Sequence, residues 1–177
     1  MIVMKLKKGL VHVYTGNGKG KTTAAFGLAL RAIGKGLKVY CIQFMKGSKD
    51  YGEVIMAERI PNLTLRQFGR DEFVDRKNPA EIDIQLARDG LEHAREVMKG
   101  NYDVLILDEI NCAIEWNLIK VDEVIELIES RPDGMEIILT GRYAHSKLIE
   151  IADYVTEMKE IKHPFIKGVK LREGIEF

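Results

Sequence analysis

The sequence of 177 residues is about the size of one domain, and its 46% apolar and 31% charged content is that of an ordinary globular protein. Its 27 basic residues are balanced by 27 acidic ones, and this net charge of zero gives no electrostatic basis for binding a nucleic-acid backbone or an anionic membrane. Since no apolar run approaches the roughly 20 residues that span a bilayer, we expect a single domain over residues 1–177 with neither nucleic acid nor membrane as its partner.

The first half of the chain alternates apolar runs with helical patterns. A strand is expected over residues 10–14, followed by a glycine-rich segment and a helix that Gly34 and Gly36 end. Further strands are expected over residues 39–44 and 63–68, with a short helix between them.

The second half continues the alternation. Asn78 and Pro79 are typical of a helix start, with Asn78 as the cap, and this helix is expected to run to about Lys99. The remaining strands are expected over residues 104–107, 137–139 and 154–158, with a helix over residues 121–128 before the second of them. Continuous apolar strands separated by amphipathic helices indicate a mostly parallel sheet covered on both faces, which is a three-layer α/β fold.

The segment after the first strand, TGNGKGKTT, resembles a phosphate-binding loop with unusual spelling. The usual pattern is Gly, four residues, then Gly-Lys-Ser/Thr, but here the first position is Thr15. A dinucleotide fingerprint fails because its third glycine would fall on Lys21. A plain surface loop is the alternative, and the strand before and the helix after favour phosphate binding, with Lys21 reaching the phosphates and the Thr22 hydroxyl available to Mg²⁺.

Two more strand ends carry polar residues where ligands of parallel sheets bind. Asp108 and Glu109 follow the strand VLIL, where a carboxylate beside such a loop commonly holds Mg²⁺. Spacing does not decide which of the two binds the metal directly. Arg142 follows the strand EIIL and suits either a phosphate clamp or a structural ion pair.

Other candidates have ordinary explanations. Cys41 and Cys112 lie in apolar segments without metal-ligand spacing, which is typical of reduced, buried thiols in a cytoplasmic protein. No serine or cysteine has the surroundings of an activated nucleophile. Trp116 is expected to pack, and His145 to cap a helix start.

Taken together, TGNGKGKTTAA, VYCIQF with Met45-Lys46-Gly47, LILDE, ILTGR and the tail from ADYVTEMKE to Phe177 resemble the P-loop ATP:corrinoid adenosyltransferases, the cob(I)yrinic acid a,c-diamide or cob(I)alamin adenosyltransferases. The resemblance extends from about Gly9 to Phe177 and includes the threonine before the first loop glycine. It implies a P-loop domain of RecA-like fold.

The resemblance also implies a reaction, in adenosylcobalamin synthesis or salvage. Reduced Co(I) attacks the 5′ carbon of ATP, and inorganic triphosphate leaves. Co(I) is a strong nucleophile, so no general base is needed. Mg²⁺ would be held by Thr22, Asp108 and Glu109, and Lys21 would neutralise the leaving group. The residues implied to bind ATP are Thr15, Gly16, Asn17, Gly18, Lys19, Gly20, Lys21, Thr22, Thr23 and Arg142.

For the corrinoid, relatives place aromatic residues after the third strand, and this chain has GRDEFV there. Phe73 is therefore the candidate corrinoid contact, with an ordinary packed loop phenylalanine as the alternative. Longer relatives cover the site with an N-terminal extension, whereas about eight residues precede the first strand here, so closure is expected from a partner subunit or from the C-terminal tail. A homodimer in the cytoplasm and an electron-donating flavoprotein partner are implied.

Two other classes compete with this interpretation. A generic P-loop ATPase or small-molecule kinase would release phosphate or ADP and would need a residue to position water or a hydroxyl. A RecA-like nucleic-acid motor fits poorly with a small chain of zero net charge.

Overall fold

The structure is a computed structural model that describes residues 5–176. Its sheet consists of the strands β1 (Val11–Thr15), β2 (Val39–Phe44), β3 (Leu63–Phe68), β4 (Val104–Asp108), β5 (Glu136–Thr140) and β6 (Tyr154–Glu157). The helices are α1 (Lys21–Ile33), α2 (Gly52–Ala57), α3 (Glu81–Met98), α4 (Ile110–Glu115), α5 (Val121–Glu129), α6 (Ser146–Ile151) and a 3₁₀ turn, η1 (Pro164–Lys167).

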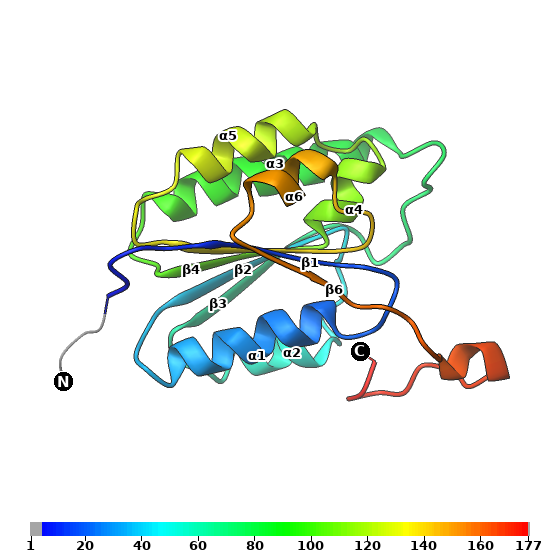
Figure 1. Ribbon diagram of the computed structural model, residues 1–177. Helices are drawn as coiled ribbons and strands as arrows, with labels where there is room; N and C mark the ends of the chain where they lie inside the picture. Colours follow the sequence, from blue (N-terminus) through cyan, green and yellow to red (C-terminus); the bar gives the residue numbers. More distant parts are fainter. Residues whose placement is uncertain (1–4, 177) are drawn as a thin grey trace.

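The six strands form one sheet in the order β3-β2-β4-β5-β1-β6, and all five neighbouring pairs are parallel. Helices α1 and α2 cover one face of the sheet, and α3, α4, α5 and α6 cover the other (Figure 1). The expected three-layer α/β fold is confirmed.

Each face of the sheet has its own hydrophobic core. On the α1 side, Ala25 and Ala29 pack against Cys41 and Ile106 within one cluster, and small side chains let α1 lie close to the strands. On the other face, a larger cluster joins the strands to α3, α4 and α5. Every residue of β2 is buried, because this central strand is covered on both sides.

The strands agree well with the sequence expectations, and the helices agree less well. β2 and β3 have the expected ranges. The expected Asn78 cap is wrong: α3 begins at Glu81, its N-cap residue is Ala80, and no side chain caps it. Instead, Arg70 from the preceding loop forms two hydrogen bonds to the buried Asp83 in the first turn, so a tertiary contact fixes where this helix starts.

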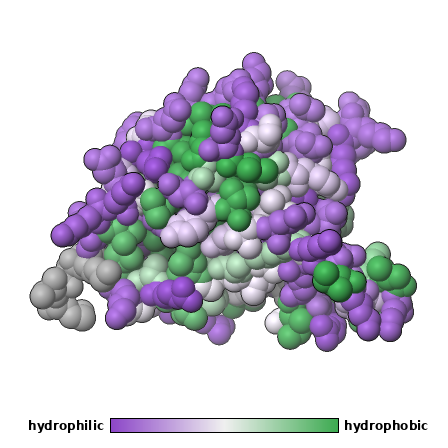
Figure 2. All heavy atoms as spheres, in the orientation of Figure 1, coloured by the Kyte–Doolittle hydropathy of each residue, from purple (hydrophilic) through white to green (hydrophobic). Residues whose placement is uncertain are grey.

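The chain after β6 leaves the body of the molecule (Figure 1). No residue beyond Leu148 belongs to the buried hydrophobic core of the described chain. Figure 2 shows apolar surface in the middle of the face carrying α6 and β6, and more of it on the tail at the lower right. The exposed apolar side chains of these regions are Ile149, Ile151, Tyr154, Val155, Ile161, Phe165, Ile166, Val169, Leu171 and Ile175.

Between residues 5 and 176, no helix has the length and hydropathy that crossing a membrane requires.

Candidate active site

The loop between β1 and α1 gets its shape from glycines with positive φ. Gly16 has φ 95° and Gly20, the N-cap residue of α1, has φ 117°. This conformation strains other residue types and lets the loop turn sharply into the helix. The first N–H groups of α1 have no partner inside the helix, so they point toward the loop as donors for an anion.

The loop is also packed against the protein's own C-terminal segment. The Gly18 N–H donates to the Met158 carbonyl at 2.6 Å, and the Met158 N–H donates to the Thr15 carbonyl at 2.8 Å. A Cβ atom added to Gly16 or Gly18 would lie 2.5 or 2.7 Å from the Met158 carbonyl oxygen. Both glycines are therefore required by the contact with the chain after β6, independently of any ligand.

Lys21 at the start of α1 folds back into the loop. Its Nζ donates to the carbonyls of Gly16 and Gly18 at 2.9 and 2.7 Å. Burial lowers the pKa of Lys21, because the charged form loses hydration. The ammonium group is thus held at the centre of the loop by two acceptors that an anion could replace.

Asp108, at the end of β4, is fully buried and accepts four side-chain hydrogen bonds. Its Oδ1 accepts from the hydroxyls of Thr22 at 2.8 Å and Thr140 at 2.6 Å. Its Oδ2 accepts from Gln43 Nε2 at 3.0 Å and from Lys46 Nζ at 2.8 Å. Residues at the ends of β2 and β5 and at the start of α1 therefore meet on this one carboxylate at the end of β4.

The two neighbouring carboxylates have opposite electrostatic environments. Burial acts to raise the pKa of Asp108, but the Lys46 charge and the hydrogen bonds from Lys46, Thr140 and Thr22 outweigh it, so this pKa lies below its usual value. The pKa of Glu109 is raised, first by burial and then by the negative charge of Asp108. A cation near Glu109 would therefore stabilise its ionised form.

The chain turns sharply where the strands end beside this network. Met45 after β2 and Glu109 after β4 have φ values of 58° and 65°, and Tyr143, shortly after β5, has φ 60°. Positive φ is uncommon for such residues and occurs often at functional sites. The three turns direct Met45, Glu109 and Tyr143 to the wall of one cavity.

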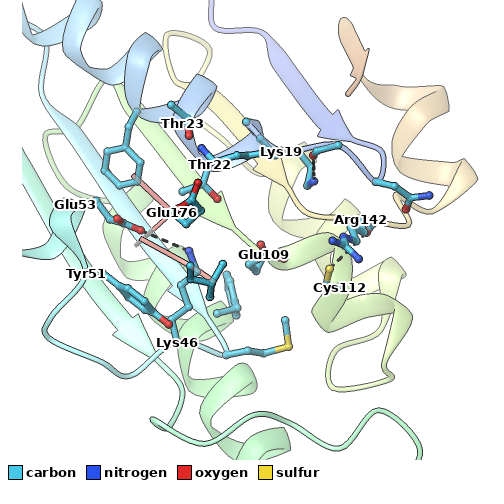
Figure 3. Close-up of a pocket in the computed structure, with 18 of the residues that line it drawn as sticks. Lys19, Thr22, Thr23, Lys46, Tyr51, Glu53, Glu109, Cys112, Arg142 and Glu176 are labelled. Atoms are coloured by element: carbon cyan, nitrogen blue, oxygen red, sulfur yellow. Dashed lines mark hydrogen bonds and ion pairs between the residues drawn. The ribbon is translucent and has the colours of Figure 1, made fainter. Parts of the chain in front are cut away.

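That cavity has a volume of about 840 Å³ and lies over the carboxyl ends of the strands (Figure 3). The expected site residues 17–23, Glu109, Arg142 and Phe73 all line it. Asp108 lies beneath its floor and is reached through Thr22. Thr15 and Gly16 do not line it, and the Thr15 hydroxyl instead accepts a hydrogen bond from the Ala144 N–H at 3.1 Å.

Phe73 lies on the loop between β3 and α3, and its side chain is 100% exposed. Neighbouring residues anchor that loop: Val74 packs against the core, and the Arg76 guanidinium lies 5.1 Å from the centre of the Trp116 ring. Trp116 packs against the core, as expected, and also lines the cavity. The packed alternative for Phe73 does not describe this structure, since the ring has no buried contact.

Several residues of the site were missed from the sequence: Gln43, Lys46, Tyr51, Glu53, Thr140 and the tail residues His163, Leu171, Ile175 and Glu176. A signal existed for Gln43, the one amide in the apolar strand VYCIQF. The others depend on tertiary contacts. Glu53, for example, accepts from Gln43 Nε2 at 3.0 Å. The cavity wall formed by the tail agrees with the expectation that the tail contributes to closure.

Cys112 is not a nucleophile candidate. Burial and the neighbouring Glu109 raise the pKa of its thiol to about 12, so the reactive thiolate is rare at neutral pH. Both cysteines are buried and free.

The oxygen atoms of Thr22, Asp108 and Glu109 are hard donors of the kind that Mg²⁺ prefers. The described residues contain no cluster of three or more His, Cys, Asp or Glu side chains that could enclose a metal alone. Mg²⁺ usually takes one or two carboxylates together with substrate phosphates and water. The donor set therefore fits a magnesium ion that arrives with a polyphosphate.

Comparison with known proteins gives a consistent result. Residues 7–177 match the family described as "ATP:corrinoid adenosyltransferase BtuR/CobO/CobP". The chain is similar to the "Corrinoid adenosyltransferase" of Escherichia coli (strain K12), with 37% identity over 172 residues, 97% of this chain and 87% of the relative. It is 39% identical to the protein of that name from a Sinorhizobium species, covering 97% of this chain and 81% of the relative. It is 35% identical to the "Corrinoid adenosyltransferase CobA" of Salmonella typhimurium (strain LT2), covering 97% and 87%.

Proposed function

Because this chain belongs to the ATP:corrinoid adenosyltransferase family, we propose that its cavity binds ATP against the glycine-rich loop and presents the 5′ carbon to a reduced corrinoid. The chain is an adenosyltransferase that uses ATP to adenosylate a corrinoid. It acts as a single P-loop domain over residues 1–177.

One observation carries the nucleotide part of this proposal. Thr22 and Asp108 lie 86 positions apart in the sequence, yet their side chains are hydrogen-bonded at 2.8 Å beside the loop that lines the cavity. A hydroxyl at the start of the loop helix and a strand-end carboxylate are the pair that positions Mg²⁺ on the phosphates in P-loop proteins.

The reaction follows from the chemistry of the two substrates. Co(I) supplies an electron pair to the 5′ carbon, the cobalt–carbon bond forms, and the bond from that carbon to its oxygen breaks. The triphosphate leaves with the electron pair of the broken bond. Donors aimed at the departing phosphates lower the barrier because negative charge grows there.

The chain's own residues supply those donors. The N–H groups of residues 17–23 and the Lys21 ammonium bind the phosphates, with Lys21 exchanging the carbonyls of Gly16 and Gly18 for phosphate oxygens. Arg142 lines the same cavity beside Cys112 and binds a phosphate or the nucleotide (Figure 3). Thr15 and Gly16 shape the loop from behind.

Magnesium completes the nucleotide site. Thr22, Asp108 and Glu109 would hold it, and the bound ion would supply positive charge for the polyphosphate. The raised pKa of Glu109 supports this assignment, because burial and Asp108 leave that carboxyl in need of a cation.

The corrinoid approaches from the open side of the cavity, where Phe73 is exposed on an anchored loop. An aromatic ring under the corrin would displace the lower axial ligand of cobalt and make its reduction easier. An electron-donating flavoprotein supplies the reduction. The cytoplasm is the compartment that fits this chemistry and the two free, buried thiols.

We also propose a homodimer. The exposed apolar side chains Ile149, Ile151, Tyr154 and Val155 lie on α6 and the edge strand β6, where a second copy could cover them. Light scattering during size-exclusion chromatography tests this assembly, and Ile149→Asp should shift a dimer toward monomer. A wild-type protein that elutes as a monomer at all concentrations would rule the dimer out.

The decisive experiment follows the leaving group. With chemically reduced corrinoid and Mg-ATP under anaerobic conditions, phosphorus NMR should show triphosphate appearing at the rate at which the visible spectrum shows the cobalt–carbon product. The product ratio should be one to one. ADP and phosphate accumulating instead would identify the chain as a hydrolase or kinase.

A further inference from the structure

The turn after β2 contains a lysine, Lys46, that has no role in the proposed reaction as described above. Lys46 follows Met45, whose positive φ turns the chain toward the cavity. Gly47 and Gly69 fix this turn against the loop after β3: a Cβ on Gly69 would lie 2.3 Å from the Lys46 nitrogen, and one on Gly47 would lie 2.6 Å from the Arg70 carbonyl carbon. The backbone of Lys46 is therefore packed closely against the loop after β3.

The side chain of Lys46 is enclosed by acceptors and by an aromatic ring. Its Nζ lies 2.8 Å from Asp108 Oδ2, 3.6 Å from Glu53 Oε1 and 5.6 Å from the centre of the Tyr51 ring. The side chain is 20% exposed and lines the cavity on the side facing the loop helix (Figure 3). Two carboxylates, Asp108 and Glu53, therefore surround the Lys46 ammonium group.

A metal ion bound by Thr22 and Asp108 would have to change the hydrogen bonds that Asp108 accepts. Both Asp108 oxygens are already fully used, and Lys46 is the only one of the four donors to Asp108 that carries a charge. Two cations on one buried carboxylate repel each other strongly because the local dielectric is low. The metal must weaken or replace the contact between Lys46 and Asp108.

The Lys46 side chain can adopt another position when its contact with Asp108 is broken. Glu53 and Tyr51 keep the ammonium near the cavity, and its four-carbon stem can swing toward the space over Thr22 and Lys21. A triphosphate carries more negative charge than one loop lysine can balance, and here it must depart as a unit.

We infer that Lys46 is a cation that neutralises Asp108 until the magnesium nucleotide binds and then moves to the polyphosphate. It is then a second phosphate-binding lysine, which lines the same cavity as Lys21. This inference rests on the proposed function, since it assigns Lys46 to the triphosphate leaving group. A lysine that only stabilises buried Asp108 is the competing explanation.

The test measures binding rather than turnover, with Mn²⁺ alone and with inorganic triphosphate plus Mg²⁺ as probes. Lys46→Gln keeps an N–H donor for Asp108 but removes the charge. Its affinity for Mn²⁺ should rise by about threefold or more, because nothing charged competes for Asp108. Its calorimetric affinity for triphosphate with Mg²⁺ should fall by about tenfold or more, because a charged hydrogen bond is lost.

A second variant tests the competition between Lys46 and the metal for Asp108 even if Lys46→Gln fails to fold. Lys46→Arg keeps the ion pair, and its forked guanidinium binds a carboxylate more firmly than lysine does. Its Mn²⁺ affinity, measured by the electron paramagnetic resonance of free Mn²⁺, should therefore fall below that of the wild type. An Mn²⁺ affinity equal to the wild type in Lys46→Arg would overturn the inference.

The surface variant Lys99→Gln removes the same charge from an exposed pair with Glu96 and serves as the matched control. It should change neither affinity, and equal changes there would overturn the inference by showing an effect of overall charge. Unchanged triphosphate affinity in a folded Lys46→Gln would also overturn it. Phosphorus NMR of the wild type tests the proposed function separately, because ADP in that experiment contradicts the transferase without involving Lys46.

Discussion

Single residues at the site make structural contacts within the protein in addition to their proposed contacts with ligands. Lys21 binds two loop carbonyls, Asp108 binds four donors, and Gly16 and Gly18 accommodate the Met158 carbonyl. The unusual spelling of the loop has a local reason: Thr15 still belongs to β1, and its hydroxyl accepts from the Ala144 N–H, while Gly16 makes the turn. The first glycine of the usual pattern is thus one position late because the strand extends through Thr15.

Removing the loop lysine should stop the reaction and leave the fold intact. Lys21→Ala should lower the rate of transfer by at least about 100-fold, since a charged donor to the leaving group is lost. The melting temperature should change little, because Lys21 bonds only to loop carbonyls. Anaerobic absorbance of the corrinoid and a circular-dichroism melt measure the two effects, with Lys99→Ala as the control. Near-normal transfer at saturating ATP would remove Lys21 from the mechanism.

Removing the charge of Glu109 and removing that of Asp108 should have different effects on stability. Glu109→Gln should raise the Mg²⁺ concentration needed for half-maximal rate without loss of stability, because it relieves repulsion from Asp108. Asp108→Asn should also cost about 3–5 kcal/mol of unfolding free energy, because it removes the charge of a fully buried carboxylate that pairs with Lys46 and accepts four hydrogen bonds. Rates across a magnesium titration and urea unfolding give the two readouts. If neither variant changes the metal dependence, the metal assignment at this strand end is wrong.

At the scale of elements, the site forms because four neighbouring parallel strands, β2, β4, β5 and β1, have their carboxyl ends on the same side of the sheet. β5 lies between β1 and β4, and its last residue, Thr140, completes the contacts of Asp108. The loop between β3 and α3 is anchored through Arg70 to Asp83 and through Arg76 to Trp116. The exposed ring of Phe73 is therefore presented by a loop tied at both ends.

Phe73→Ala should separate the reduction of cobalt from the transfer itself. The variant should lose activity from Co(II) corrinoid with a mild reductant more than from chemically prepared Co(I), because displacement of the axial ligand is bypassed once Co(I) is free. Stability should not change, since the side chain is 100% exposed. Initial rates from the two starting states provide the comparison, and equal losses would assign Phe73 a role other than aiding reduction.

Sequence patterns predicted an element reliably where its apolar run is long and continuous or where glycines mark its ends. The buried run of β2, the strand β3 and the glycine-rich loop belong to this group. The short helix α4 escaped prediction because Ile110–Ile114 is buried on all sides and shows no amphipathic period. Lys46 and Glu53 could not be assigned to the site from sequence, because only the pairing of β2 with β4 brings them to Asp108.

At the scale of the whole molecule, the compact sheet and the tail have separate tasks. The described core ends at Leu148, whereas His163, Leu171 and Glu176 of the tail line the cavity. The tail is held to the loop through Met158 and carries exposed apolar side chains. It therefore belongs to the site more than to the core.

Removing residues 160–177 should therefore weaken substrate use much more than it weakens the fold. The free energy of unfolding should change by less than about 1 kcal/mol, because almost no apolar area is uncovered. The value of kcat/KM for ATP should fall at least about tenfold, because one wall of the cavity is lost. Urea unfolding and steady-state transfer rates measure the two. The matched variant Phe165→Ser, at an exposed tail position outside the cavity, should behave as the wild type, and a truncated protein with full activity would exclude the tail from catalysis.

The attachment of the tail to the loop has a practical consequence for handling the protein. Glu176 lies in the cavity wall, so an affinity tag or fluorescent fusion added after the tail would crowd this side of the cavity. At the other end of the chain, Leu6 lies beside Gly134, which directly precedes β5. Leu6 therefore lies where the strands begin, whereas the cavity lies where they end. A label placed before residue 5 leaves the entrance clear, and immobilisation through that end would orient every molecule with its cavity facing the solution.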